Sequence, residues 1–565
     1  MSQSPPVPPH SHGTPLRAAA RGYARHRPEE SVLYGVVRRE LETFLAKARW
    51  RDQPVPRFIE QELRDYLRCG VLAEGFLRVH CDDCGLDRLV PFSCKRRGFC
   101  PSCGGRRMAD TAAHLVDCVL PEVPIRQWVL TLPYPLRYRC AYDARLTSAV
   151  LRAFLRALFA ELRRRARQQG GAPRGQCGAV TFIQRFGSAL NANLHFHTLV
   201  LDGVYTRTEL RPTHFLPLPP PSHHEVARVL AGTARRITRV LASRAEGDDD
   251  ALARDEPLLA TLARASLRTR IATGLHAGER WRRLGDRVDP QDTDDKDPEA
   301  SHHVPEQGGM SLHAEVAVPA RDRRRLERLC HYVARPALAS DRLEERPDGR
   351  LAVRLKTRWR DGTTHILMEP RELLERLVPL IPPPRAHQVR YHGVLAPCAS
   401  ARDRVVPGPR PARGADAGGS AAREPITGRM GVSVGSKAPS PGARDPEVND
   451  GSARGDPRAP DRGDPPPKAA AGRPPPRRLA WAELLQRVFE VDALRCPRCG
   501  ARMRLVAAIE DPDVARKILA CLDLPARAPP LVPAPFASAG RDDEFSGGAP
   551  AWEFDQTAPD EDDTD

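Results

Sequence analysis

Two histidines one residue apart, His195 and His197, lie in the apolar stretch of residues 193–201, which is rich in aromatic and β-branched residues. This composition predicts a largely buried strand. Side chains alternate between the faces of a strand, so the two imidazoles share one face while Phe196 points into the core. Such a pair can chelate a divalent ion. The alternative is that the pair is only the polar face of a strand.

Gln184 is the polar residue expected to approach this pair. It belongs to a second predicted strand, residues 179–186, which continues through Gly187 towards the histidines. Two strands joined so closely are expected to pair antiparallel. Gln184 could then act beside His195 and His197.

A tyrosine, Tyr332, lies near the end of a predicted helix over residues 321–335, just before Pro336. The buried stripe of this helix is expected at Leu326, Leu329, Cys330 and Val333. Tyr332 lies roughly 110° from the centre of that stripe. Arg328 and Arg335 are its neighbours on the helix surface. A phenol between guanidinium groups suits a phosphate; the alternative is a tyrosine ring packed on the edge of the core.

Four cysteines follow the pattern Cys81-x2-Cys84-x15-Cys100-x2-Cys103. Each pair can direct two thiolates at one point, and two pairs complete a closed tetrahedral zinc site, which is structural rather than catalytic. Cys94 is a possible substitute ligand. Free buried thiols are the alternative. A further pair, Cys496 and Cys499, has no obvious partners in the sequence.

A short run of alternating cations suggests contact with a nucleic-acid backbone. If residues 354–360 form a strand, Arg354, Lys356, Arg358 and Arg360 share one face. A solvated strand face is the alternative.

The composition favours a polyanionic partner. The 565 residues carry 88 Lys and Arg against 72 Asp and Glu, a net charge of +16, and the isoelectric point is about 9.5. No apolar run is long enough to span a membrane and no signal-peptide core precedes the first helix, so a cytoplasmic location and no membrane partner are expected. In that compartment the 14 cysteines favour metal binding over disulfides.

The composition also divides the chain. We expect disordered residues at 1–29, a helical and zinc-binding domain at 30–110, a domain at 111–400 that carries the histidine pair and Tyr332 with an acidic insertion at 285–309, a disordered linker at 401–477, a small C-terminal Cys-x2-Cys unit at 478–525 and a disordered acidic tail at 526–565.

Three motifs in this order resemble one protein family. The segments 92–101, 183–197 and 326–332, together with residues 496–519, are similar to bacterial insertion-sequence transposases of the rolling-circle, HUH-tyrosine type. Arg328 stands where the two-tyrosine form has a second tyrosine, so the chain is closer to the single-tyrosine branch associated with common-region elements.

The resemblance implies an α+β fold: a palm-like antiparallel sheet with helices (the HUH endonuclease fold), a helical and zinc-binding domain before it, and a small zinc-knuckle-like unit after it. It implies structural Zn²⁺ and catalytic Mg²⁺ or Mn²⁺ held by His195 and His197. Gln184 is the expected third ligand, with His313 and Glu315 as alternatives.

The implied reaction is attack by Tyr332 on single-stranded DNA at insertion-sequence ends, leaving a 5′-phosphotyrosine bond. The implied partners are DNA and a host helicase, in the bacterial cytoplasm at the nucleoid. Three rival interpretations stay open: a non-catalytic zinc-ribbon DNA-binding regulator, a metallohydrolase that activates water, and a degenerate transposase copy.

Overall fold

The structure is a computed structural model that describes residues 25–169, 175–208, 211–244, 250–284, 305–359, 361–407, 482–483, 487 and 492–534. All of these belong to one unit, formed by residues 1–407 and 478–565. Most of the segments predicted to be disordered, and most of the acidic insertion, lie outside the described residues. No helix in the described ranges is both long and apolar enough to cross a membrane.

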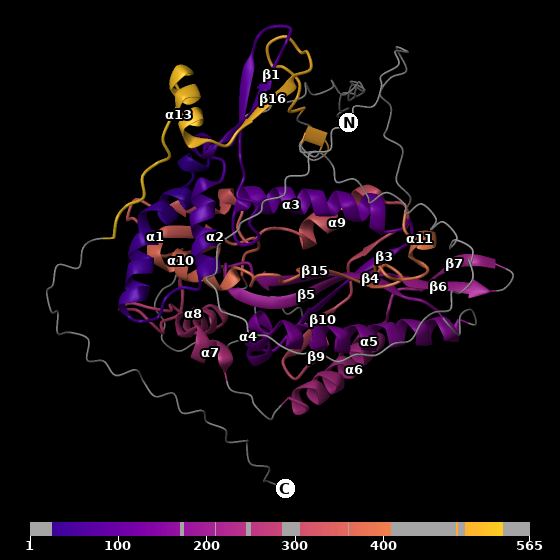
Figure 1. Ribbon diagram of the computed structural model, residues 1–565. Coiled ribbons are helices and arrows are strands. Elements are labelled where there is room, and N and C mark those ends of the chain that lie inside the picture. Colours follow the sequence, from indigo (N-terminus) through magenta and orange to yellow (C-terminus); the bar gives the residue numbers. More distant parts are fainter. Residues whose placement is uncertain are drawn as a thin grey trace, which may run out of the picture. The chain divides into compact units, whose positions relative to one another are not determined.

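The centre of the unit is a seven-stranded antiparallel sheet, so the fold is mixed α and β (Figure 1). The strand order is β15-β4-β5-β3-β10-β9, and β11 also pairs with β3. The strands are β3 (Ile125–Thr131), β4 (Gly178–Phe186), β5 (Ala192–Leu201), β9 (Glu306–Gln307), β10 (Met310–His313), β11 (Ala317–Val318) and β15 (Val389–Gly393). The predicted strand around His195 is therefore β5, paired on one side with β4 and on the other with β3.

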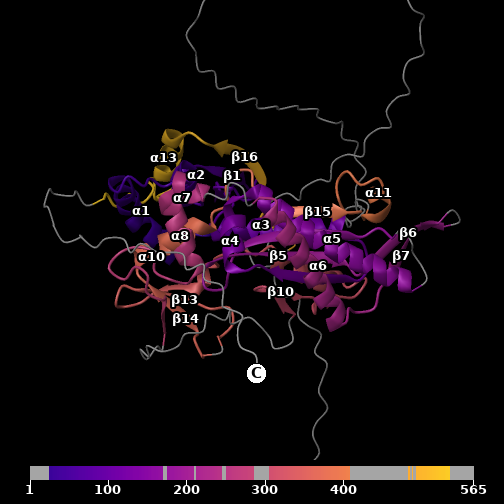
Figure 2. The same cartoon turned by 90° about the horizontal axis from the view of Figure 1, so that it is seen from below.

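Helices cover both faces of this sheet, as Figures 1 and 2 show. Alternation along β5 sends Leu194, Phe196 and Val200 to one face and Leu199 and Leu201 to the other. The first face packs on α4 (Tyr134–Tyr142), α5 (Ala144–Gln168) and α6 (His223–Ala242). The second packs on α3 (Pro101–His114), the π-helical turn η3 (Leu115–Val119), α9 (Arg323–Val333) and α11 (Arg402–Val405).

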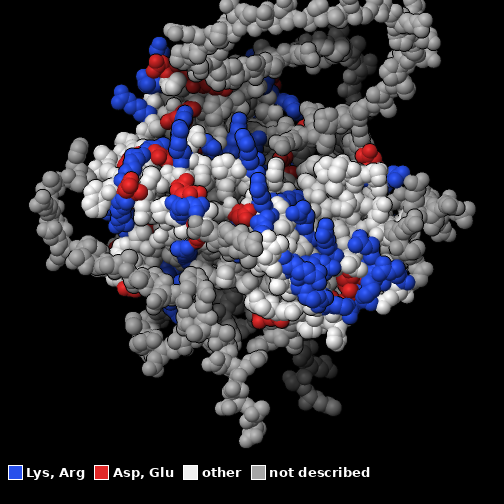
Figure 3. Space-filling view, turned by 60° about the horizontal axis from the view of Figure 1, so that its bottom comes forward, with Lys and Arg blue, Asp and Glu red and all other residues white. Residues whose placement is uncertain are grey.

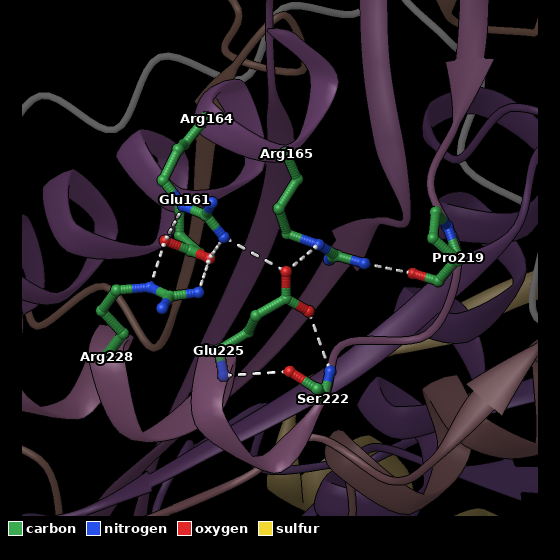
Figure 4. A network of polar contacts seen from close by, with 7 residues as sticks. All are labelled: Glu161, Arg164, Arg165, Pro219, Ser222, Glu225 and Arg228. Carbon is green, nitrogen blue, oxygen red and sulfur yellow. Dashed lines mark hydrogen bonds and ion pairs between the residues drawn. The ribbon is translucent and has the colours of Figure 1, made fainter. Parts of the chain in front are cut away.

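Charged side chains join α5 to α6 (Figure 4). Glu161 on α5 accepts from Arg228 on α6 at 3.1 Å, and Arg165 on α5 contacts Glu225 on α6 at 3.1 Å. Glu225 also completes a capping box with Ser222, which fixes the start of α6. The pair of helices therefore covers its face of the sheet as a single layer.

A second core holds the N-terminal helices. Apolar residues at helical spacing in α1 (Val32–Trp50) and α2 (Arg57–Arg68) pack with α8 (Pro257–Leu267), α10 (Pro370–Leu377) and a four-stranded sheet. That sheet has the order β12-β13-β14-β8: β12 (Leu343–Glu345), β13 (Leu351–Arg354), β14 (His365–Met368) and β8 (Arg282–Arg283). Helix α7 (Ala251–Asp255) precedes α8, and Pro257 at the first position of α8 separates the two helices.

The third sheet joins two strands from the N-terminal region to one strand from the C-terminal region. Its order is β16-β1-β2, from β1 (Phe76–His80), β2 (Asp87–Pro91) and β16 (Arg504–Ile509). The helix after β16, α13 (Pro512–Cys521), packs Ala515 and Leu519 on Leu72 and Phe76. The segment predicted as a separate C-terminal unit therefore completes the N-terminal region.

The remaining elements are short. They are the β6 (Gly203–Thr208) and β7 (Arg211–Pro217) hairpin and the single turns η1 (Pro28–Glu30), η2 (Leu72–Glu74), η4 (Ser340–Arg342) and η5 (Val378–Leu380). Three of the short elements lie inside segments predicted to be irregular: η1, β9 and α11.

Candidate active site

The two histidines of β5 meet through their outer ring nitrogens. His195 Nε2 lies 2.9 Å from His197 Nε2, and the ring centroids are 4.7 Å apart. Two ligand atoms at right angles around an ion with bonds of about 2.1 Å would be about 3 Å apart. His195 Nδ1 lies 2.9 Å from the backbone oxygen of Asn193, which orients the ring. The pair thus has the spacing of a chelate.

The two histidine rings differ in how deeply they are buried. His197 is 4% exposed, whereas His195 is half-buried. Burial is the main reason that the pKa of His197 lies well below its ordinary value of 6.5, and the nearby positive charges of Arg335 and Lys356 lower it further. His197 is therefore neutral at neutral pH, the form in which imidazole binds metal.

Gln127, on β3, contacts the inner ring nitrogen of His197. Its side-chain amide lies 2.7 Å from His197 Nδ1 and is itself buried. An amide has both a donor and an acceptor, so it can pair with either tautomer. If Nε2 of His197 binds an ion, Nδ1 must carry the proton and donate it to Gln127 Oε1. Gln127 was not predicted from the sequence; the signal was a polar residue inside the apolar strand 125–131.

Gln184 lies directly across from His195 in the β4–β5 pairing, so its side chain leaves the sheet on the same face. Its Nε2 donates to the backbone oxygen of Val333 at 2.8 Å. Its Oε1 is buried and has no hydrogen-bond partner. A buried carbonyl oxygen without a partner is costly unless something else binds it. This oxygen and the two imidazole nitrogens are a donor set that fits a divalent cation such as Mg²⁺ or Mn²⁺.

The alternative third ligands are less well placed. His313 is one strand further away, since it pairs with Val129, which in turn pairs with His197. Glu315 follows the end of β10 and is exposed.

Helix α9 brings Tyr332 to the histidines. The predicted stripe is the one observed: Leu326, Leu329, Cys330 and Val333 are buried. The helix begins at Asp322, whose side chain accepts from the backbone N–H of Arg325 at 3.0 Å. Tyr332 is 38% exposed, and its ring stands edge-on to that of His197 with centroids 5.9 Å apart. The last residue of α9, Val333, is the one that Gln184 contacts.

Two cations flank the tyrosine ring. The guanidinium of Arg335 lies 4.7 Å from the ring centroid of Tyr332, and Nζ of Lys356 lies 3.9 Å from it. Arg335 Nη1 is buried and has no hydrogen-bond partner. A buried donor without a partner beside an exposed phenol is suited to an anion such as a phosphate.

The other predicted DNA-binding cations do not form a track. Strand β13 ends at Arg354, which pairs with Asp341 at 3.0 Å. Beyond it the chain turns, so Lys356 reaches Tyr332 while Arg358 donates to the backbone oxygen of Gly362 at 3.2 Å. The strand prediction for residues 354–360 was therefore wrong after Arg354. Arg328 is exposed on α9, and Arg360 lies outside the described residues.

A second basic surface lies on the opposite side of the sheet, on α5 and α6. Figure 3, seen from that side, shows Lys and Arg side chains gathered in a patch. The exposed arginines of the two helices are Arg145, Arg152, Arg156, Arg167, Arg228, Arg235 and Arg239. Such a surface suits non-specific contact with phosphates.

The cysteines form two clusters, and the predicted grouping of four was wrong. Within each cluster all four sulfurs lie within 4.8 Å of one another. The first contains Cys69, Cys94, Cys100 and Cys103, and the second contains Cys81, Cys84, Cys496 and Cys499. The hairpin of β1 and β2 directs Cys81 and Cys84 towards the C-terminal segment, so they do not meet Cys100 and Cys103. Cys94, predicted as a substitute, is a member; Cys69 was missed because it lies outside any Cys-x2-Cys pair.

Two protein families match this chain. Residues 178–403, which include the histidine pair and Tyr332, match a family described as "Putative transposase". Residues 36–132, which include six of the eight clustered cysteines, match the "Transposase zinc-binding domain". No curated protein and no solved structure matches. The two matches support a transposase of the IS91 type, with DNA as its partner and a zinc-binding domain in its N-terminal region.

Proposed function

We propose that the protein nicks and rejoins single-stranded DNA at insertion-sequence ends through a covalent bond to Tyr332, on a sheet of the HUH endonuclease type. The observation that carries this proposal is the position of Tyr332: its ring lies 5.9 Å from that of His197, between two cations. The transposase matches agree with this class of reaction. A rolling-circle cycle in the bacterial cytoplasm, helped by a host helicase that unwinds the ends, would supply the single strand.

The reaction is a transesterification. The hydroxyl of Tyr332 attacks the phosphorus, a tyrosine O–P bond forms and the bond to the 3′-oxygen breaks. The proton lost by the phenol is matched by the proton that the 3′-oxygen gains. The bond energy stays in the new ester, so the released 3′-hydroxyl can reverse the step without ATP.

The residues around Tyr332 have separate roles. Arg335 and Lys356 hold the phosphate beside the hydroxyl and offset its charge. His195, His197 and Gln184 would hold Mg²⁺ or Mn²⁺, which when bound polarises a non-bridging phosphate oxygen. Gln184 also hydrogen-bonds the end of α9, so the same side chain would connect the ion site to the helix of the nucleophile.

Other tyrosines are poorer nucleophiles. Among the tyrosines in the described ranges, Tyr332 is exposed and the others are buried or half-buried. Tyr205 is buried, and burial raises its pKa to about 12. Burial also raises the pKa of Tyr391. The guanidinium of Arg402 lies 5.9 Å from the ring centroid of Tyr391, farther than the 3.9 Å between Nζ of Lys356 and the ring of Tyr332.

The test is incubation of the full chain with labelled single-stranded element-end DNA and Mn²⁺, followed by a denaturing gel. The wild type should give a covalent protein–DNA band, and Tyr332→Phe should lose it while still binding DNA. Phenylalanine keeps the ring that Arg335 and Lys356 contact, so folding should change little. Tyr391→Phe is the matched control and should form the band normally.

Three results would contradict the proposal in different ways. A covalent band from Tyr332→Phe would move the nucleophile to another residue. DNA cut with free phosphate ends and no covalent band would favour a metallohydrolase. DNA binding by the wild type without any cutting would favour a non-catalytic zinc-ribbon regulator or a degenerate copy.

A further inference from the structure

The second cysteine cluster is made by two turns of the same construction. In each, Cys-x2-Cys is followed by a glycine with positive φ: Gly85 at +68° and Gly500 at +79°. Each glycine N–H donates to the carbonyl of the first cysteine, at 2.9 Å in the first turn and 3.0 Å in the second. In the first turn the backbone N–H of Cys81 donates to the backbone oxygen of Leu86 at 2.9 Å. In the second turn the backbone N–H of Cys496 donates to the backbone oxygen of Ala501 at 2.8 Å. These turns present two sulfurs outward, as zinc knuckles do.

The sulfurs of the two turns converge. Cys81 Sγ lies 3.4 Å from Cys499 Sγ, and Cys84 Sγ lies 3.4 Å from Cys496 Sγ. Around a tetrahedral zinc with bonds of about 2.3 Å, the sulfurs would be about 3.8 Å apart. Four thiols at this spacing without disulfides therefore outline a closed tetrahedral site.

The surroundings bring the two turns together. Strand β16, which follows the second turn, pairs antiparallel with β1, which precedes the first. Arg504 contacts Asp82 at 2.8 Å, and Arg88 donates to the backbone oxygen of Ala493 at 2.6 Å. Under the sulfurs lies a small apolar cluster with Val79, Val90 and Met503. So small a core needs a further stabilising element.

We propose that Cys81, Cys84, Cys496 and Cys499 bind a second zinc ion, forming a zinc ribbon whose halves come from opposite ends of the chain. Cys84 and Cys496 are 412 positions apart. The match to a transposase zinc-binding domain ends at residue 132 and so does not include the C-terminal half. The ion fastens residues 492–534 to the N-terminal region, and this link depends on the four cysteines rather than on the chain between them.

A residue just before the fastened segment contacts the helix of the candidate nucleophile. Arg487, shortly before the second turn, contacts Asp117 in η3 and lies 3.0 Å from Glu327 on α9. Glu327 is one turn and a residue before Tyr332. Loss of the split site should therefore weaken a contact on α9, besides freeing the C-terminal segment.

Elemental analysis of paired variants tests which cysteines share an ion. The wild type should hold two zinc ions per chain. Cys81→Ser with Cys84→Ser, and Cys496→Ser with Cys499→Ser, should each hold one, and all four changes together should still hold one. Combining Cys81→Ser and Cys84→Ser with Cys100→Ser and Cys103→Ser should leave none. Cys521→Ser, in the same C-terminal segment and exposed, is the control and should keep both.

Two patterns of zinc content would overturn the proposal. One is a chain that keeps all its zinc without Cys496 and Cys499. The other is loss of both ions when only the four proposed ligands are changed.

A second measurement does not depend on variants that fold. A protease site is inserted between residues 408 and 477 of the otherwise unchanged chain, and the purified protein is cut there. The C-terminal fragment should stay with the N-terminal fragment through gel filtration and separate after zinc is removed with a chelator. Fragments that stay together after full loss of zinc would show that the metal does not fasten them. Fragments that separate while the zinc content is two would also refute the split site.

Discussion

Adding one methyl group at Gly104 tests whether the packing of α3 positions the candidate active site. Gly104 faces the segment that follows Tyr332: a Cβ at this position would lie 2.6 Å from Cβ of Pro336 and 3.4 Å from its Cγ. Ordinary carbon–carbon contacts are about 3.5–4 Å. The segment carrying Arg335 and Pro336 must therefore move by about 1 Å in Gly104→Ala. At the next residue, Gly105, a Cβ would meet nothing within 4 Å.

The two glycines form a matched pair for measuring the cost. In a helix, Gly→Ala favours the folded state by up to about 1 kcal/mol. Gly105→Ala should show this gain. Gly104→Ala has the same gain but overpacks its contact, which costs about 1–3 kcal/mol. The free energy of unfolding should therefore be lower for Gly104→Ala than for Gly105→Ala by about 1–3 kcal/mol.

Urea denaturation of both variants measures this difference, and the covalent-adduct assay measures the effect on the site. Zinc content is determined in parallel, because both glycines lie within two residues of Cys103, a member of the first cysteine cluster. Adduct formation should fall in Gly104→Ala and stay normal in Gly105→Ala. Equal stability of the two variants would refute the steric reasoning. If Gly104→Ala is destabilised but forms the adduct at the normal rate, the contact between α3 and Pro336 does not control the position of Tyr332.

Three further outcomes are expected. Gln127→Met should weaken Mn²⁺ binding about 10–100-fold, because His197 loses its partner at Nδ1, whereas Gln127→Glu should retain the binding. Calorimetric titration with Mn²⁺ measures both affinities. Weak binding by Gln127→Glu together with normal binding by Gln127→Met would contradict this reasoning. Burial, with a smaller effect of Arg390, lowers the pKa of His392 to about 4. As the pH falls from about 6.5 to 4, only the unfolded chain binds a proton at His392, so the free energy of unfolding decreases. In His392→Leu, urea titrations should show a decrease smaller by roughly 3 kcal/mol over this range. The same pH dependence of the free energy of unfolding in wild type and variant would refute this. Asp202→Ala leaves Arg126 buried without the carboxylate 2.7 Å away, so the free energy of unfolding should drop by about 3–5 kcal/mol, and a drop below 1 kcal/mol would contradict the role of this pair.

The local parts of the candidate site were predictable from the sequence. Apolar runs of strand length predicted β4 and β5, and alternation placed His195 and His197 on one face. The 3.6-residue stripe gave α9 with Tyr332 beside it rather than within it. Strand alternation and the helical stripe both arise from residues close together in the sequence, so the pattern of apolar residues reveals them. The short connection between β4 and β5 predicted their antiparallel pairing, and the structure adds the register that places Gln184 opposite His195.

The long-range parts were not predictable in the same way. Thiols have no periodicity, so the regular spacing of Cys81, Cys84, Cys100 and Cys103 suggested one site although the fold divides them between two. Pairing of β1 with β16 decides that division, across more than 400 positions of sequence. Similarly, alternation of cations suggested a strand past Arg354, but the chain turns there and directs Lys356 to the tyrosine ring.

The difference in burial across the candidate site restricts how a nucleic acid could reach it. In the proposed reaction the phosphate would touch the hydroxyl of Tyr332, which is 38% exposed, and also come close to His197, which is 4% exposed. It can approach only from the side of Tyr332 and His195, since apolar packing and Gln127 close the other side of His197. On the open side, Arg335 and Lys356 already contact the tyrosine ring. A duplex keeps its phosphates on the outside of a rigid cylinder, whereas one strand can bend a single phosphate inward. If Tyr332 is the nucleophile, as proposed, a single strand would therefore bring a phosphate to its hydroxyl more readily than a duplex would.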